Sequence, residues 1–308
     1  MKTAIPGRVP GLPNTPDEMA ARHYGDPFQE QRLLKASTGR VDMSHKGVLQ
    51  LSGSDRLVYL NSLTTQLLLD LTPGESALTL NLNPQGFILH ELHVIDDGED
   101  TWVITEPGTT QELLQYLVKM KFLMKVEIAD VSDEWCVVFE NSSTRHASFL
   151  TWLNPFALGG REILVPQSQL IDYVAESPVG MWAHTALRVE HMIPRLGFET
   201  DHHTIPNEVG WLETAVHLDK GCYRGQETIS KVTRLGKPPR RLALVHFDGS
   251  IDDLPEHGTE VFLEDSKVGF VGTSVQHFEL GPIASVVLKR SVVEGQLRIN
   301  NMNVMLDS

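Results

Sequence analysis

The sequence predicts an α+β fold, from its length and from two contrasting patterns along the chain. Its 308 residues suffice for about two domains of roughly 150 residues, or for three small ones. From about Arg40 short strand-like and helix-like segments alternate, whereas after Arg241 short strand-like segments recur at intervals of roughly ten residues. That second pattern predicts a small all-β barrel or sandwich, and the double proline Pro238-Pro239 is its expected boundary.

Turn signals separate the elements expected before this boundary. The stretch 77–95 predicts a hairpin, because Asn83-Pro84-Gln85-Gly86 interrupts two strand-like runs. A helix is expected over 181–192, since Pro194 would stop it. Residues 1–25 contain four prolines and are expected to form a flexible arm.

The composition restricts the possible partners and location. Lys and Arg number 26 and Asp and Glu 40, a net charge of −14. A chain this acidic should not coat nucleic acid or anionic membranes over its whole surface, so any anion site must be local. No apolar run approaches the ~20 residues that span a bilayer, and no signal-like segment opens the chain. We therefore expect a cytoplasmic protein without a membrane partner.

The cysteine and histidine content argues against structural metal or disulfide frameworks. The chain has 2 cysteines, Cys136 and Cys222, and no C-x-x-C pair. His90 and His93 would point to opposite faces of a strand, which opposes shared metal ligation. No metal site is expected. Cys136 lies in the apolar run 135–139 and is expected in the core.

A basic segment over residues 220–241 stands out on this acidic chain. It holds seven basic residues and one acid, Glu227, so its charge is 7 − 1 = +6 and the remainder is −14 − 6 = −20. This contrast indicates a local site for an anionic ligand, although a solvated helix face would give the same pattern. The seven are Lys220, Arg224, Lys231, Arg234, Lys237, Arg240 and Arg241.

Cys222 is the candidate reactive group of this segment. It lies between Lys220 and Arg224, just before a helix expected to begin at Gly225. Nearby cations and a helix N-terminus both favour the thiolate. The alternative is that Cys222 is a small buried hydrophobic residue. Gly221 and Gly225 leave the backbone free to approach a ligand.

The same segment resembles a known signature. Lys220-Gly221-Cys222-Tyr223-Arg224-Gly225-Gln226-Glu227 is similar to the K-G-C-Y-x-G-Q-E motif of the YgfZ family, folate-binding relatives of the glycine-cleavage T-protein. The resemblance extends over most of the chain, the first ~25 residues excepted. Its other matching stretches are Gly53-x-Asp55-Arg56, Leu60-Asn61, Thr64-Thr65-Gln66, Leu82 to Gly86, and Arg188-x-Glu190.

This resemblance implies a three-domain T-protein-like cloverleaf around a central folate cavity. The arm 1–25 would precede a folate-binding region of two interleaved α+β domains over 26–238 and a C-terminal β-barrel over 239–308. The cofactor would be tetrahydrofolate or a derivative, with Glu190 accepting hydrogen bonds from the pterin. The basic segment could hold the glutamate tail of the folate. The other folate-binding residues implied are Arg188, Asn83, Tyr223 and Arg224.

The resemblance further implies a role in the assembly or repair of iron–sulfur clusters. The partners would be iron–sulfur client or assembly proteins, and Cys222 would project toward the folate cavity as a reactive thiol. The protein could act as an accessory factor without turnover. If it is an enzyme, the resemblance implies a one-carbon (aminomethyl) transferase.

Two other functions stay open. A folate-dependent aminomethyltransferase or demethylase of the T-protein type would carry an acidic pair where this chain has His90-Glu91, although either residue could serve as a general acid or base. An RNA-modification accessory protein could use the basic segment, but the acidic remainder makes nucleic acid an unexpected partner. For Glu190, a salt bridge on a helix surface is the alternative to pterin binding.

Overall fold

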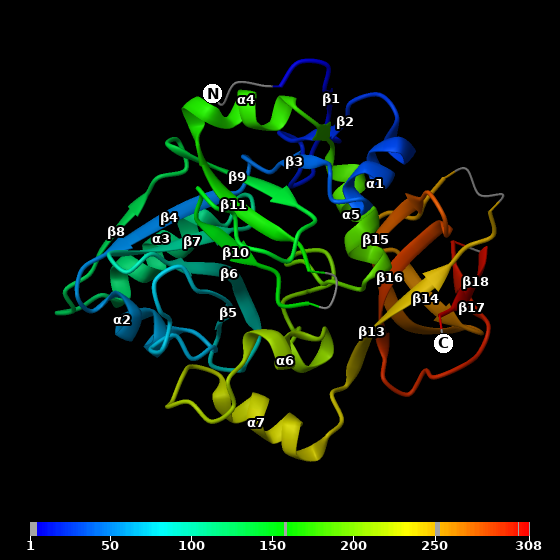
Figure 1. Cartoon of the computed structure of the whole chain (residues 1–308). Helices are drawn as coiled ribbons and strands as arrows, with labels where there is room; N and C mark the ends of the chain where they lie inside the picture. Colours follow the sequence, from blue (N-terminus) through cyan, green and yellow to red (C-terminus); the bar gives the residue numbers. More distant parts are fainter. Residues whose placement is uncertain (1–4, 157–158, 250–252, 301, 308) are drawn as a thin grey trace.

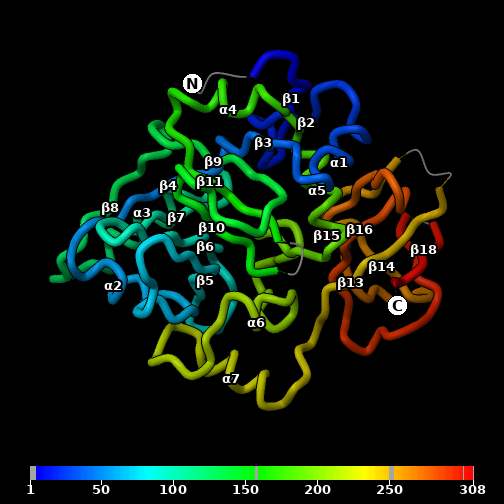
Figure 2. The backbone as a smooth tube through the Cα atoms, viewed as in Figure 1, coloured from blue at the N-terminus to red at the C-terminus, as the bar shows by residue number. Residues whose placement is uncertain are grey.

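The computed structural model describes residues 5–156, 159–249, 253–300 and 302–307 (Figure 1). Their main elements are two five-stranded sheets and a closed six-stranded barrel. Helices pack on and between these parts, and the barrel lies at one side of the molecule (Figures 1 and 2). The predicted α+β class and C-terminal barrel are thereby confirmed.

The first sheet has the strand order β10-β11-β9-β3-β12. Its central strand β9 contains Cys136, which is fully buried, as expected. Strands β3 and β12 pair in parallel although residues 43–177 separate them along the chain. The bounds are β10 Thr151–Leu153, β11 Arg161–Pro166, β9 Trp135–Glu140, β3 Arg40–Asp42 and β12 Pro178–Val179.

The second sheet has the order β5-β6-β7-β4-β8, and the expected hairpin forms its β5–β6 edge. Helices α2 (Arg56–Leu63) and α3 (Thr110–Met120) pack on it through one apolar cluster. The hydroxyl of Tyr59 donates to the carbonyl of Leu117, which joins the two helices. The strands are β5 Ser76–Leu82, β6 Ile88–Asp96, β7 Asp100–Thr105, β4 Gly47–Ser52 and β8 Glu127–Asp130.

The barrel begins directly after Pro239 and encloses its own apolar core. Alternation along each strand places one set of apolar side chains inside. The barrel strands are β13 Arg240–His246, β16 Gly281–Lys289, β15 Ser266–His277, β14 Glu260–Leu263, β17 Leu297–Ile299 and β18 Met302–Leu306.

Helix α5 (Met181–Glu190) connects the barrel to the rest of the molecule. Ala186 and Val189 pack into an apolar cluster with β13, β15 and β16, while Met181 and Leu187 join the main core. The helix therefore buries one face against the barrel and another in the main core, and its polar residues lie between these two parts. The remaining helices are α1 Pro27–Lys35, α4 Leu170–Ala175, α6 Trp211–Ala215, α7 Gln226–Leu235, η1 Gln167–Gln169 and η2 Pro206–Glu208.

The N-terminal segment differs from the expected flexible arm. Residues 1–4 lie outside the described residues, but strands β1 (Val9–Pro10) and β2 (Ala21–His23) pair, and Ile5 is buried. Between them, Asp17 forms an ion pair with Arg195 in the interior. Proline content favours irregular backbone, yet a buried guanidinium that needs a counter-ion can still hold such a segment in place.

Within the described residues, no helix is both long enough and apolar enough to cross a membrane.

Candidate functional site

A cavity lies where both sheets and helix α5 meet, and buried ionisable groups line much of its wall. Its apolar wall includes Phe139, Trp152 and Phe156. The ionisable lining residues are Lys46, Glu91, His93, Glu106, Glu162, His184, Arg188 and Arg195.

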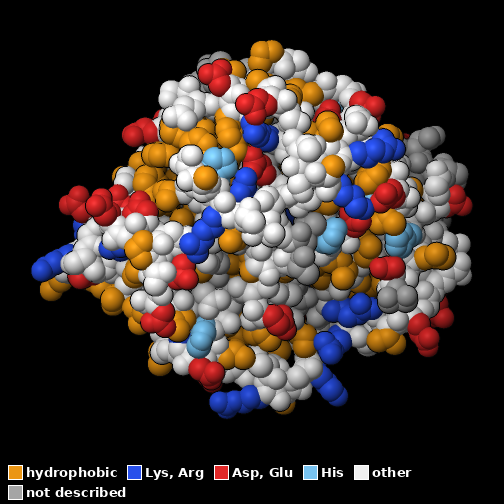
Figure 3. All heavy atoms as spheres, in the orientation of Figure 1, with side chains coloured by type: hydrophobic (Ala, Val, Ile, Leu, Met, Phe, Trp, Pro, Cys, Tyr) orange, Lys and Arg blue, Asp and Glu red, His pale blue; other side chains and the backbone are white. Residues whose placement is uncertain are grey.

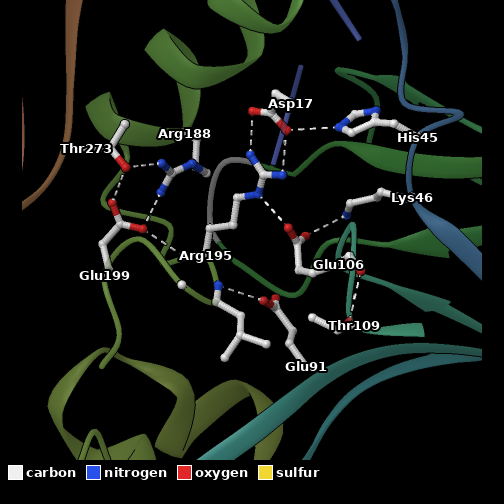
Figure 4. A network of polar contacts seen from close by, with 12 residues as sticks. Asp17, His45, Lys46, Glu91, Glu106, Thr109, Arg188, Arg195, Glu199 and Thr273 are labelled. Atoms are coloured by element: carbon white, nitrogen blue, oxygen red, sulfur yellow. Dashed lines mark hydrogen bonds and ion pairs between the residues drawn. The ribbon is translucent and has the colours of Figure 1, made fainter. Parts of the chain in front are cut away.

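Lys46 and Arg195 are joined through a carboxylate (Figure 4). The Lys46 ammonium lies 2.7 Å from Glu162 and 3.2 Å from Glu106. The other oxygen of Glu106 accepts a 2.7 Å hydrogen bond from Nε of Arg195, whose two Nη atoms bind Asp17 at 2.8 and 2.7 Å. Although burial opposes ionisation, Arg195 and Lys46 lower the pKa of Glu106 to about 2. The network is therefore fully ionised at neutral pH.

His93 forms the second arm of the network. Its ring lies between Glu162 (Nδ1 to Oε2, 2.8 Å) and Glu91 (Nε2 to Oε1, 3.1 Å), and it stacks on Trp152 at 3.7 Å between ring centroids. Burial alone would lower the pKa of His93, but the two carboxylates outweigh it and raise this pKa to about 9. His93 is thus a cation in the cavity wall at pH 7.

Arg188 links the cavity to the barrel. Its guanidinium binds Glu199 at 2.7 Å, and Glu199 also accepts a 2.6 Å hydrogen bond from Thr273 of β15. The same carboxylate accepts the backbone N–H of Arg195 at 2.9 Å. The Glu199 carboxylate therefore binds both Arg188 and Arg195 at the junction of α5 and the barrel (Figure 4).

His184 is a neutral member of the wall that sequence reasoning did not find. It is half-buried and packs edge-on against Phe139 at 4.7 Å between ring centroids. Burial first, and then the nearby Arg188, lower its pKa to about 3. His184 lies four residues before Arg188 on α5, so both side chains face the same side of the helix. This spacing is the sequence signal that could have placed His184 in the same site.

Arg188 and Glu190, both predicted to bind folate, lie on different sides of α5. Arg188 lines the cavity, whereas Oε1 of Glu190 pairs with Lys35 of α1 at 3.1 Å. Oε2 of Glu190 lies 3.3 Å from Nε2 of His277 and has no hydrogen-bond partner among the described residues. Residues two apart on a helix lie about 200° apart around its axis, so both cannot face one cavity. The salt-bridge alternative describes Glu190 in this structure.

The other predicted residues gather elsewhere, at the loop before α7. Lys220 is buried there, and its ammonium donates to the backbone carbonyls of Asn61 (2.6 Å), Thr64 (2.7 Å) and Gln66 (2.7 Å). The carbonyl of Asn61 belongs to the last turn of α2, and those of Thr64 and Gln66 to the stretch that follows it. All three donors of the ammonium are therefore used, and Lys220 fixes the loop to that stretch.

The β5–β6 turn closes the same corner. Gly225 has a φ of +84°, and a Cβ there would lie 2.8 Å from both the carbonyl oxygen of Asn83 and the Cα of Gly86. The side chain of Asn83 accepts from the N–H groups of Gln85 and Phe87, so it shapes the turn. Three stretches that carry the YgfZ resemblance therefore meet here, residues 60–66, 82–86 and 220–227. We call this place the signature corner.

The signature corner, not the cavity, contains the candidate thiol. Cys222 is exposed, and neither it nor Asn83, Tyr223 or Arg224 lines the cavity. Tyr223 is 7% exposed, and its hydroxyl has no hydrogen-bond partner among the described residues. Gln226 donates weakly to the carbonyl of Lys220 at 3.5 Å. Gly221, Arg224 and Glu227 are exposed. The expectation that Cys222 projects into the central cavity is corrected accordingly.

The basic segment is only partly available to a ligand. Lys220 is used internally, Arg240 binds Asp201 and Glu208, and Arg241 donates to the carbonyl of Val292. The four exposed bases are Arg224, Lys231, Arg234 and Lys237. This reduces the exposed positive charge expected for an RNA-binding segment.

His90 and Glu91 separate on β6 as strand alternation requires. Glu91 lines the cavity and accepts the N–H of Leu196 at 3.2 Å, while His90 is buried and absent from the cavity lining. Of the two, only Glu91 can act on a cavity ligand. In the part of the chain that the structure describes, no three His, Cys, Asp or Glu side chains are grouped to hold a metal ion.

Comparison with known proteins defines the class to which this fold belongs. Residues 21–139 match the model of the GCVT N-terminal domain. A crystal structure of the glycine cleavage system aminomethyltransferase T from Bartonella henselae superposes with a TM-score of 0.82, covering 98% of this chain and 93% of that one at 15% identity. The chain therefore has a T-protein-like fold, and its residues 21–139 resemble the GCVT N-terminal domain.

Two relatives at the sequence level are named aminomethyltransferase. An aminomethyltransferase of Bacillus subtilis (strain 168) is 23% identical over 301 residues, covering 84% of this chain and 82% of the relative. An aminomethyltransferase of Rippkaea orientalis is 25% identical over 282 residues, covering 79% and 75%.

We expect the stability of the protein to peak near pH 6.5. His93, with its pKa raised to about 9, contributes stability that is complete below pH 6.5 and lost as pH rises through 9. His184, with its pKa lowered to about 3, must stay neutral, so stability falls as pH drops below 6.5; Glu106 adds to this loss below pH 4.5. Urea unfolding across pH 4–9 measures the curve.

The variant His93→Gln is the control for the alkaline side. It should lower stability at pH 6.5 and flatten the decline between pH 6.5 and 9, to which His93 contributes about 3 kcal/mol. An equally steep alkaline decline in the variant would exclude His93 as its source.

A methyl group at Gly225 should destabilise the signature corner. In Gly225→Ala the alanine must adopt the left-handed backbone of this position, and its Cβ would clash with Asn83 and Gly86. We expect the free energy of unfolding to fall by about 1–3 kcal/mol. Gly221→Ala is the matched control, because no heavy atom lies within 4 Å of its added Cβ. The difference in urea midpoint measures the effect, and equal midpoints would show that the two loops do not pack closely.

Proposed function

We propose that the protein is a YgfZ-type, tetrahydrofolate-binding factor that assists iron–sulfur cluster assembly or repair in the cytoplasm, with Cys222 as its reactive thiol. The observation that carries this proposal is the signature corner. There Lys220 donates hydrogen bonds to carbonyls at the end of α2, and Gly225 packs against the β5–β6 turn. These contacts join the loop that carries the exposed Cys222 to parts of the chain that are distant in sequence. The T-protein fold supports the folate part.

The central cavity has the chemistry to bind a reduced folate. The carboxylates of Glu91 and Glu162 can accept hydrogen bonds from a pterin, and Trp152 and Phe156 offer flat apolar surfaces. The free volume is about 40 Å³, room for about three water molecules. Binding therefore requires displacement of wall side chains, and Phe156, which packs at the edge of the main core, is only half-buried. A bound folate would supply a one-carbon carrier.

The exposed thiol suits chemistry with a second protein. Cys222 is accessible while Cys136 is buried, so only Cys222 can reach a partner. Exposed Arg224 beside it, together with the exposed bases of α7, favours a negatively charged partner surface. A thiolate there can exchange with a partner's thiol or ligate a cluster iron.

Folate binding is tested by calorimetric titration with tetrahydrofolate and its 5-formyl form. We expect saturable binding that Glu91→Gln weakens by about tenfold or more, since it removes a charged hydrogen-bond acceptor from the cavity wall. Glu190→Ala tests the site implied by the family resemblance, and Glu279→Gln, which also removes a partner of Lys35, is its control. Weakening by Glu190→Ala alone would place folate outside the cavity, and no binding would refute the proposal.

The thiol role is tested with Cys222→Ser in a strain that lacks the wild-type gene. We expect normal folding and folate binding, but loss of activity of an iron–sulfur enzyme that depends on the protein. Native alkylation should label Cys222 and spare Cys136, which confirms access. Arg224→Gln is a milder control. Full enzyme activity with Cys222→Ser would exclude a thiol mechanism.

A second function, folate-dependent aminomethyl transfer or demethylation, is favoured by the names of the relatives and by the position of Glu91 in the cavity. Glu91 could accept or donate a proton there. Formation of methylenetetrahydrofolate from tetrahydrofolate and an aminomethyl donor, abolished by Glu91→Gln but retained by Cys222→Ser, would establish this function instead.

A further inference from the structure

The turn between α3 and β8 exposes two large apolar side chains. Phe122 is 81% exposed and Leu123 is 100% exposed, far more than an ordinary surface hydrophobic residue. The turn lies at the outer end of the second sheet, and Figure 3 shows orange and blue side chains together at that tip (compare Figure 2). We call residues 119–125 the α3–β8 tip.

The α3–β8 tip is held in this shape by the backbone. Phe122 has a left-handed φ of +46°, which is unfavourable for a bulky residue. The N–H of Met124 donates to the carbonyl of Lys121 at 3.0 Å, and the N–H of Lys125 donates to the carboxylate of Asp55 at 2.8 Å. Met124 packs into the apolar cluster of the second sheet. The two exposed side chains are thus presented outward by a closed turn.

Positive charge surrounds these apolar side chains. Lys119, Lys121 and Lys125 lie within the tip, and none of them forms a salt bridge among the described residues. With Glu127 included, and with Asp55, whose carboxylate accepts the N–H of Lys125, the local charge is 3 − 2 = +1, while the rest of the chain carries −14 − 1 = −15. Because charges interact over roughly 8 Å at physiological salt, the lysines act locally despite the acidic remainder.

We propose that the α3–β8 tip binds an anionic lipid surface, with Phe122 and Leu123 entering the interface and the three lysines contacting lipid headgroups. Apolar side chains flanked by lysines are the combination that binds peripheral proteins to anionic bilayers. The tip is convex and small, whereas a stable protein partner needs an interface of roughly 1,200 Å² or more. The lack of a long apolar run in the sequence and the negative net charge led us to expect no membrane partner, but neither bears on a local contact.

Co-sedimentation with vesicles tests this proposal independently of folate binding. The full chain should bind vesicles of phosphatidylglycerol mixed with phosphatidylcholine, release at high salt, and ignore vesicles of phosphatidylcholine alone. The double variant Phe122→Asn, Leu123→Ser and the triple variant Lys119→Glu, Lys121→Glu, Lys125→Glu should each reduce binding by about tenfold or more. Asn is chosen at 122 because it tolerates a left-handed backbone.

A matched control uses Val293, which is 70% exposed in the barrel, outside the tip. Val293→Ser should bind vesicles as the wild type does.

Tryptophan fluorescence gives a second test. Anionic vesicles should shift the emission of Leu123→Trp to shorter wavelength by more than they shift the emission of the wild type. No vesicle binding by the wild type, or equal binding by the tip variants and the wild type, would overturn the proposal. Circular dichroism and the urea midpoint confirm that each variant is folded.

Discussion

The pairing of buried charges around Glu106 is the interaction on which the centre of the molecule depends. Glu106 holds Lys46 and Arg195 together, and Arg195 in turn holds Asp17. An unpaired charge at such depth costs several kcal/mol, so the network forms only when the segments that carry these residues are docked together. The central packing of the N-terminal segment and the chain after α5 therefore follows from electrostatics as much as from apolar contact.

The same network explains the character of the cavity. Its cations and carboxylates are already paired with one another, whereas the buried Nδ1 atom of His184 has no hydrogen-bond partner among the described residues. A ligand must compete with existing partners or use groups that retain free acceptor positions, such as Glu91. His184 adds a neutral ring held uncharged by its burial and by neighbouring cations. The cavity thus favours a ligand with several hydrogen-bond donors over a simple anion.

Two regions with different chemistry lie on one scaffold. The cavity is enclosed and ionic, whereas the signature corner places a thiol at the surface, between a lysine anchored on three carbonyls and a short basic helix. A small molecule suits the first and a protein suits the second. Glycines at 86 and 225 permit the close backbone contact that joins the corner to the second sheet.

The sequence by itself determined the α+β class, the β5–β6 hairpin and the barrel after Pro239, because strand spacing and turn residues are local signals. It also singled out the stretches that meet at the signature corner, through their resemblance to a family. Only the tertiary structure decided which of those residues share a site. Glu190 turns away from the cavity that Arg188 lines, and the wall is completed by Lys46, His93, Glu106, Glu162 and His184. Such pairings join residues far apart in the chain, and no local pattern encodes the partner of a buried charge.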